Sequence, residues 1–180
     1  ILMVLELPVP FAPSFYGLDF SELPALIGAF AYGPVAGVMI EFCKILIKLV
    51  LKPSSTAFVG ELANFSISCM LVLPASVIYL FKKSRKQAIL GTVVGTLIMT
   101  AFGSCFNAIY LLPKFSELYG IPLDAIIGMG TAINPAIHSI SGLVLMCVVP
   151  LNLLKGGLVS LITILVYKKL SPILKAAHKQ

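Results

Sequence analysis

Long apolar runs separated by short polar breaks follow one another along most of this chain. Several windows of about 20 residues carry no charged side chain, and at about 1.5 Å per residue a helix of that length crosses a bilayer. Apolar and polar residues do not alternate over segments of about ten residues, as the strands of a membrane-spanning barrel require. The pattern therefore predicts an all-α, polytopic membrane protein.

Turn-forming residues mark where the helices begin and end. Ser21 has the chemistry of a helix N-cap, with Glu22 in the first turn, and Gly33-Pro34 interrupts the apolar run that follows. We interpret Ile1–Leu7 as the end of a first helix that is truncated here. The other breaks predict helices at residues 21–32, 35–51, 56–81, 88–112 and 136–167, a half-helix at 123–133 and a loop at 113–122.

The predicted helices form a compact six-transmembrane-helix bundle when the truncated first helix is counted. Two pairs of glycines lie four residues apart, in Gly33–Gly37 and in Gly91–Gly95. Small residues at this spacing allow helix backbones to approach one another closely in a membrane. We therefore expect close helix packing along these two segments.

Composition supports the membrane assignment, and the positive charges predict an orientation. Hydrophobic residues make up 59% of the 180 positions and charged residues 11%, whereas soluble proteins carry about 25% charged residues. Eight of the 13 cationic residues lie in Lys82–Lys86 and Lys168–Lys179, which two predicted crossings separate. By the positive-inside rule the basic loop 82–87 and the C-terminal tail should be cytoplasmic. We read the basic tail as setting topology and expect no nucleic-acid partner.

The chain lacks the residue groups that most enzymes need. The four cysteines stand singly within apolar runs, and neither histidine has a metal-ligand partner at a suitable spacing. No Ser/His/Asp arrangement and no nucleotide-binding motif can be assembled. We therefore expect no catalytic residue, no metal site and no enzymatic activity.

The best candidate for a functional site is a pair of polar residues inside the last apolar run. Asn152 and Lys155 are one helical turn apart within residues 141–167, and a lysine in mid-membrane costs about 2.5–3.5 kcal/mol, so it normally faces a cavity or a partner. Glu61 and Asn64 repeat the same spacing, and Asn107 lies one turn before Tyr110. Two alternatives remain open: Lys155 snorkels to the interface, or a Glu–Lys pair with neighbouring amides acts as a structural lock.

Aromatic residues could line such a cavity together with these polar groups. Combined with amides and one cation, they suit a planar heteroaromatic ligand with a polar edge, although each of them could equally be packing or an interface belt. A second charged group on the third helix, Glu41, Lys44 and Lys48, is either a structural pairing or has a proton or gating role. The aromatic candidates are Phe15, Tyr16, Phe20, Phe58 and Tyr110.

Five segments together resemble the riboflavin-binding S component of energy-coupling factor (ECF) vitamin transporters. They are Phe15-Tyr-Gly-Leu-Asp-Phe-Ser-Glu-Leu-Pro24, Gly33-Pro-Val-Ala-Gly37, Glu61-Leu-Ala-Asn64, Asn107-Ala-Ile-Tyr110 and Asn152-Leu-Leu-Lys155. The resemblance covers nearly the whole chain. It implies one transmembrane substrate-binding domain over residues 1–180, in a bacterial plasma membrane.

The resemblance also implies an activity and partners. The protein would capture riboflavin from outside, with riboflavin as its transported ligand and no cofactor, and a transmembrane coupling subunit with two ABC-type ATPases would supply the energy. Alternatives are an S component for FMN or another heteroaromatic vitamin, such as a thiamin precursor or a pterin, and a membrane protein whose buried polar residues are only structural. The implied ligand-binding residues are Leu18, Asp19, Thr56, Ala57, Phe58, Glu61, Asn64, Asn107, Tyr110, Asn152 and Lys155.

Overall fold

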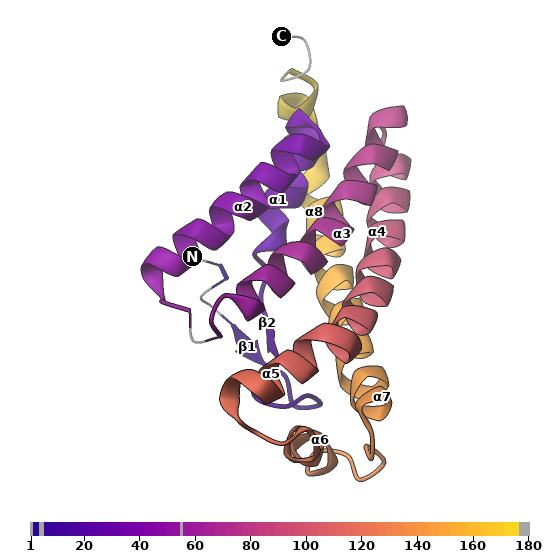
Figure 1. The fold of residues 1–180 in the computed structure, drawn as a ribbon. Coiled ribbons are helices and arrows are strands. Elements are labelled where there is room, and N and C mark those ends of the chain that lie inside the picture. The colour runs from indigo at the N-terminus through magenta and orange to yellow at the C-terminus, as the bar shows by residue number, and fades with distance from the viewer. Residues whose placement is uncertain (1, 4–5, 55, 177–180) are drawn as a thin grey trace.

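The protein is a bundle of helices with one short β-hairpin (Figure 1). The computed structural model describes residues 2–3, 6–54 and 56–176, with side chains described up to residue 166. The hairpin pairs β1 (Leu7–Pro8) with β2 (Gly17–Leu18) in antiparallel register. The helices are α1 (Glu22–Tyr32), α2 (Pro34–Leu51), α3 (Val59–Phe81), α4 (Arg85–Phe106), α5 (Leu112–Tyr119), α6 (Leu123–Thr131), α7 (Ile140–Leu143) and α8 (Val149–Ala176), with π-helical turns η1 (Asn107–Leu111) and η2 (Val144–Val148).

The predicted all-α membrane architecture is confirmed. Three helical segments are long and apolar enough to cross a membrane: Val59–Phe81, Arg85–Tyr119 and Ile140–Val166. Helix α1 is apolar but has only 11 residues, and α2 carries three charged side chains in its 18 residues. Gly33, whose φ of 96° suits glycine, joins α1 to α2, so the predicted break at Gly33-Pro34 is confirmed.

The interpretation of Ile1–Leu7 as the end of a helix is wrong for its described residues. Leu2 and Met3 lie in a turn, and Leu7 begins β1, paired with Leu18. The prolines that follow Leu7 fix φ and remove backbone donors, which favours a reversing chain over a helix. Residues 1, 4 and 5 lie outside the described part of the chain.

Two prolines do not end their helices, because a π-helical turn precedes each of them. The predicted loop at 113–122 is helical as far as Tyr119, since η1 ends at Leu111 and Pro113 then falls in the first turn of α5. The Leu112 N–H closes the π-helical turn by donating to the Asn107 carbonyl, and Pro113, which has no N–H to donate, follows directly after it. Pro150 likewise follows η2 at the start of α8, which runs beyond the predicted end at residue 167.

Glycines on α4 bring it very close to α3. A Cβ on Gly91 would lie 2.5 Å from the Ala75 carbonyl oxygen, and one on Gly95 would lie 2.5 Å from the Leu71 carbonyl oxygen. The expectation of close helix packing at this pair is therefore confirmed, and side chains of α1, α3, α4 and α8 fill the core beside it.

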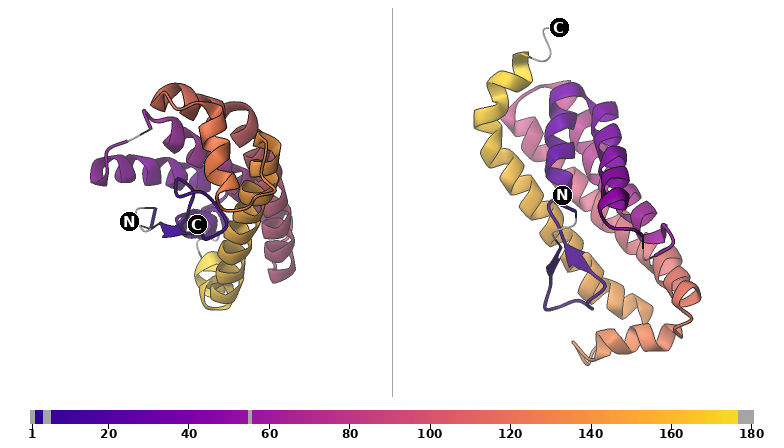
Figure 2. Two further views of the ribbon diagram at one scale, coloured as in Figure 1. Left: turned by 90° about the horizontal axis from the view of Figure 1, so that it is seen from below. Right: turned by 90° about the vertical axis from the view of Figure 1, so that its left-hand side faces the viewer.

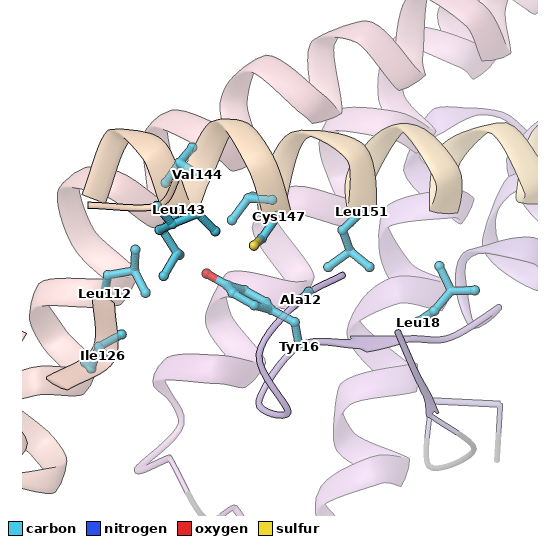
Figure 3. Close-up of a cluster of buried hydrophobic side chains, with 11 residues drawn as sticks. Ala12, Tyr16, Leu18, Leu112, Ile126, Leu143, Val144, Cys147 and Leu151 are labelled. Atoms are coloured by element: carbon cyan, nitrogen blue, oxygen red, sulfur yellow. The ribbon is translucent and has the colours of Figure 1, made fainter. Parts of the chain in front are cut away.

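The hairpin is held to the bundle by a separate apolar cluster. Ala12, Tyr16 and Leu18 pack against Cys147 and Leu151 of the last helical segment (Figure 3). The hairpin lies on the side of the molecule that holds α5 and α6, away from the C-terminal end of α8 (Figures 1 and 2). This placement covers a cavity between the helices.

Candidate ligand-binding site

A cavity of about 660 Å³ lies between the hairpin and the helices, within the size range of small-molecule sites. Its apolar lining includes Phe15, Ile67, Met99, Leu111 and Leu151. Its polar lining comes from the segment before α1, from α1, α2, α3, η1 and α8, and from the turn between α2 and α3. A ligand in this space would meet hydrophobic walls together with a small number of polar groups.

Lys155 forms the charged centre of the polar lining. Its Nζ lies 2.8 Å from Glu22 Oε1 and 3.0 Å from Asp19 Oδ2. The side chains of Glu22 and Asp19 are 0% and 4% exposed, so the low-dielectric surroundings strengthen the attraction between these charges. Ser21 holds Asp19 from the other side, because its backbone N–H and its hydroxyl both donate to Asp19 Oδ1. Lys155 therefore faces the cavity and two fixed carboxylates.

The network continues behind the cavity into α2. Lys44 Nζ lies 3.5 Å from Glu22 Oε1 and 2.5 Å from Glu41 Oε2, and Ser68 donates a hydrogen bond of 2.7 Å to Glu22 Oε1. Glu41 and Lys44 of the second charged group are thus paired with each other, whereas Lys48 of that group pairs with Glu61. These contacts join α1, α2, α3 and α8 through buried charges.

A second charged pair stands on another wall. Glu61 is paired with Lys48 and accepts hydrogen bonds of 2.8 and 3.0 Å from the hydroxyls of Ser54 and Thr56. The pair between Glu61 and Lys155 that the sequence left open is therefore not formed. Lys48 is the ion-pair partner of Glu61 instead.

Two amides, Asn107 and Asn152, lie close to Gly103 of α4. Asn107 Oδ1 accepts a 2.8 Å hydrogen bond from the Tyr16 hydroxyl, and Asn107 Nδ2 donates one of 2.7 Å to the Gly103 carbonyl. A Cβ on Gly103 would lie 2.8 Å from Asn152 Nδ2, so a larger residue at position 103 would displace the second amide.

Two buried polar atoms in this lining have no hydrogen-bond partner among the described residues: Asn152 Nδ2 and Glu22 Oε2. An unsatisfied buried polar atom costs about 1–3 kcal/mol, so most such atoms in proteins are paired. Both atoms belong to residues that line the cavity, and each keeps an unused hydrogen-bonding position.

Seven of the eleven candidate residues line this cavity: Asp19, Thr56, Glu61, Asn64, Asn107, Asn152 and Lys155. The other four do not. Leu18 is buried in the apolar cluster under the hairpin. Ala57 and Phe58 take positive φ angles in the turn before α3, with Phe58 63% exposed, and Tyr110 stacks on Phe106 at the outside of η1. Phe15 and Tyr16 of the aromatic candidates line the cavity, whereas Phe20 does not.

Glu22, Ser68 and Lys48 also line the cavity, although sequence analysis did not include them among the ligand-binding residues. Glu22 follows the N-cap position of an apolar helix, where an acidic residue is explained by the helix dipole alone. A signal was present nonetheless, since Lys155 needed a buried counter-charge and Glu22 is one of seven acidic residues in the chain. Ser68 carries no such signal, because serine is common between membrane helices.

Comparisons with known proteins agree with this architecture. The family model for the substrate-specific component of ECF transporters matches residues 1–167. The riboflavin transporter RibU of Staphylococcus aureus is 33% identical over 97% of this chain and 85% of its own length, and the riboflavin transporter FmnP of Bacillus subtilis is 30% identical over 96% and 85%. A solved structure of the S component of a bacterial ECF transporter superposes with a TM-score of 0.72 at 34% identity, covering 97% of this chain and 89% of that one.

Proposed function

This chain belongs to the ECF transporter substrate-specific component family, and on that premise we propose that it is the riboflavin-binding subunit of a vitamin uptake system. Two relatives at 30% identity or more are named riboflavin transporters, and they align with almost the whole chain. Riboflavin is the ligand rather than a cofactor, and the chain binds and delivers it without changing it chemically.

One observation carries the proposal: the cavity combines apolar walls with a polar edge that has unused hydrogen-bonding capacity. Asn152 Nδ2 is a free donor and Glu22 Oε2 a free acceptor, and Lys155 lies between Glu22 and Asp19. The isoalloxazine ring of riboflavin is flat and largely apolar, and its pyrimidine edge carries carbonyl acceptors and an N–H donor. The two sets of groups are complementary.

We assign the proposed contacts to residues that line the cavity. Asn107, Asn152 and Lys155 bind the polar edge of the ring or the ribityl hydroxyls. Asp19 holds Lys155 in place from the segment after the hairpin, and the opposite wall is formed by Thr56, Glu61 and Asn64.

Transport needs energy from other subunits. The chain contains no Gly-x-x-x-x-Gly-Lys-Ser/Thr segment with which to bind ATP. A transmembrane coupling subunit and two ABC-type ATPases are the partners we propose. The turn between α3 and α4 and the C-terminal end of α8 lie at the same end of the bundle, away from the hairpin (Figure 1). With the basic residues of that turn facing the cytoplasm, the cavity side faces outward.

The deciding experiment is the visible absorption spectrum of the protein purified in mild detergent, before and after adding riboflavin. We expect flavin bands from co-purified ligand, released on denaturation and identified by chromatography as riboflavin. Release of FMN, or displacement of riboflavin by a pterin or a thiamin precursor, would assign that compound as the ligand in place of riboflavin. A colourless protein that also leaves the fluorescence of added riboflavin unquenched would refute flavin binding.

A further inference from the structure

We propose that Tyr16 is a positioning residue that fixes the Asn107 amide and thereby sets which hydrogen-bonding pattern the cavity accepts. The inference rests on the proposed function, because its test uses riboflavin. Tyr16 lies in the hairpin and Asn107 begins η1, 91 positions later in the chain. Both residues line the cavity.

The two hydrogen bonds of Asn107 leave its amide a single orientation. The Gly103 carbonyl can only accept, so the group 2.7 Å away from it must be the amide nitrogen. The amide oxygen then faces Tyr16, whose hydroxyl donates to it over 2.8 Å. A rotation of the amide would place two oxygens against each other at Gly103, and it would reverse the hydrogen bond at Tyr16 by making the hydroxyl the acceptor.

Tyr16 is well suited to hold this orientation. Its ring is buried against Leu143, Cys147 and Leu151, so it is fixed on the side of the cavity facing α8 (Figure 3). Burial raises the pKa of the Tyr16 hydroxyl, so the group stays protonated and able to donate at any physiological pH. Packing of the ring sets the position of the Tyr16 hydroxyl, and because the hydroxyl stays protonated it remains a hydrogen-bond donor.

The fixed amide determines what remains for a ligand. Asn107 keeps one N–H and one oxygen lone pair after its two protein contacts, and the neighbouring Asn152 adds an unused donor. A ligand edge with the reverse order of donors and acceptors would leave buried groups unpaired, and such mismatches reject ligands strongly. The Tyr16 hydroxyl therefore acts on specificity without being the principal contact.

The test compares Tyr16→Phe, which keeps the ring, with Tyr32→Phe, a 70% exposed tyrosine that does not line the cavity. We expect Tyr16→Phe to weaken riboflavin binding about three- to tenfold, the range for a neutral hydrogen bond. We also expect a shift of the bound flavin's visible band, because the hydrogen bonds at the ring edge change. Tyr32→Phe should leave both unchanged.

The same substitution is then made in an Asn107→Leu background. If Tyr16 acts through Asn107, removing its hydroxyl should have no further effect there. Wild-type affinity and an unshifted band in Tyr16→Phe would overturn the inference, and so would an equal loss of affinity in both backgrounds. Failure of the wild-type protein to bind riboflavin would instead refute the proposed function, so the two failures are distinguishable.

Discussion

At the scale of single residues, Asn152 is the residue whose role is most clearly ligand binding rather than stabilisation of the fold. Its side chain is 6% exposed, and Nδ2 has no hydrogen-bond partner among the described residues. A buried amide that only stabilised the fold would donate to a protein carbonyl, as Asn107 does to that of Gly103 one helical turn earlier. The fold therefore bears the cost of an unpaired donor that a ligand acceptor would remove.

Asn152→Ala should separate binding from stability. We expect riboflavin affinity to fall by about 1–3 kcal/mol, because a buried acceptor on the ligand loses its donor. The thermal unfolding midpoint of the ligand-free protein should stay within error, since Nδ2 makes no hydrogen bond to lose. Fluorescence titration and thermal unfolding in detergent measure the two quantities.

The matched control is Asn134→Ala, an exposed amide that does not line this cavity. It should leave riboflavin affinity unchanged. Unchanged affinity in Asn152→Ala together with a lower unfolding midpoint would assign Asn152 to structure instead.

Sequence analysis could identify those site residues that are polar and lie inside apolar runs. Asn107, Asn152 and Lys155 stand out because polar groups in a membrane helix are costly, and all three line the cavity. Ala57 was predicted from the resemblance alone and Phe58 also as an aromatic candidate, and both take positive φ angles in the turn before α3, where Phe58 is exposed. Backbone conformation at two successive non-glycine residues is not visible in residue type.

At the scale of elements, the π-helical turns explain where the polar residues point. Each is followed within two residues by a proline, Pro113 or Pro150, and each lies close to a candidate amide. A π turn adds a residue to one helical turn, so it shifts the face on which later side chains lie. Sequence periodicity assumes a regular helix, which is why the loop at 113–122 was predicted wrongly.

The contact between α3 and α4 gives a prediction about stability. Gly91→Ala places a Cβ 2.5 Å from the Ala75 carbonyl oxygen, and backbone atoms must move to relieve it. We expect a loss of about 1–3 kcal/mol, the usual cost of overpacking, measured as a lower thermal unfolding midpoint.

Gly157→Ala on α8 is the matched control, because a Cβ there meets nothing within 4 Å. It should raise the midpoint slightly, since alanine favours a helix over glycine by about 0.5–1 kcal/mol. Equal effects of the two substitutions would contradict the close approach of α3 and α4.

At the scale of the whole molecule, the two ends of the bundle differ in charge and in content. The turn between α3 and α4 and the first turn of α4 carry Lys82, Lys83, Arg85 and Lys86, whereas the hairpin, which lines the cavity, lies toward the other end. This polarity predicts the orientation of the protein in the membrane.

Single cysteines at Lys83 and Glu117 test that orientation, in a variant whose four native cysteines are replaced. Both positions are exposed, and the Lys114–Glu117 pair on the surface adds little stability. A membrane-impermeant maleimide should label Glu117→Cys on intact cells and Lys83→Cys only after permeabilisation. The reverse pattern would contradict the proposed topology, because the cavity would then face the cytoplasm.

The sequence by itself determined the class of protein and the approximate helices, because long uncharged apolar runs are stable only in a membrane and only as helices. It also singled out Asn152 and Lys155, since their cost inside lipid demands a partner. Only the tertiary structure decided which charges meet. Lys155 reaches Asp19 across 136 positions of sequence, with Glu22 beside it, while Glu61 pairs with Lys48. Ion pairing depends on distances between helices, and helix packing sets those distances.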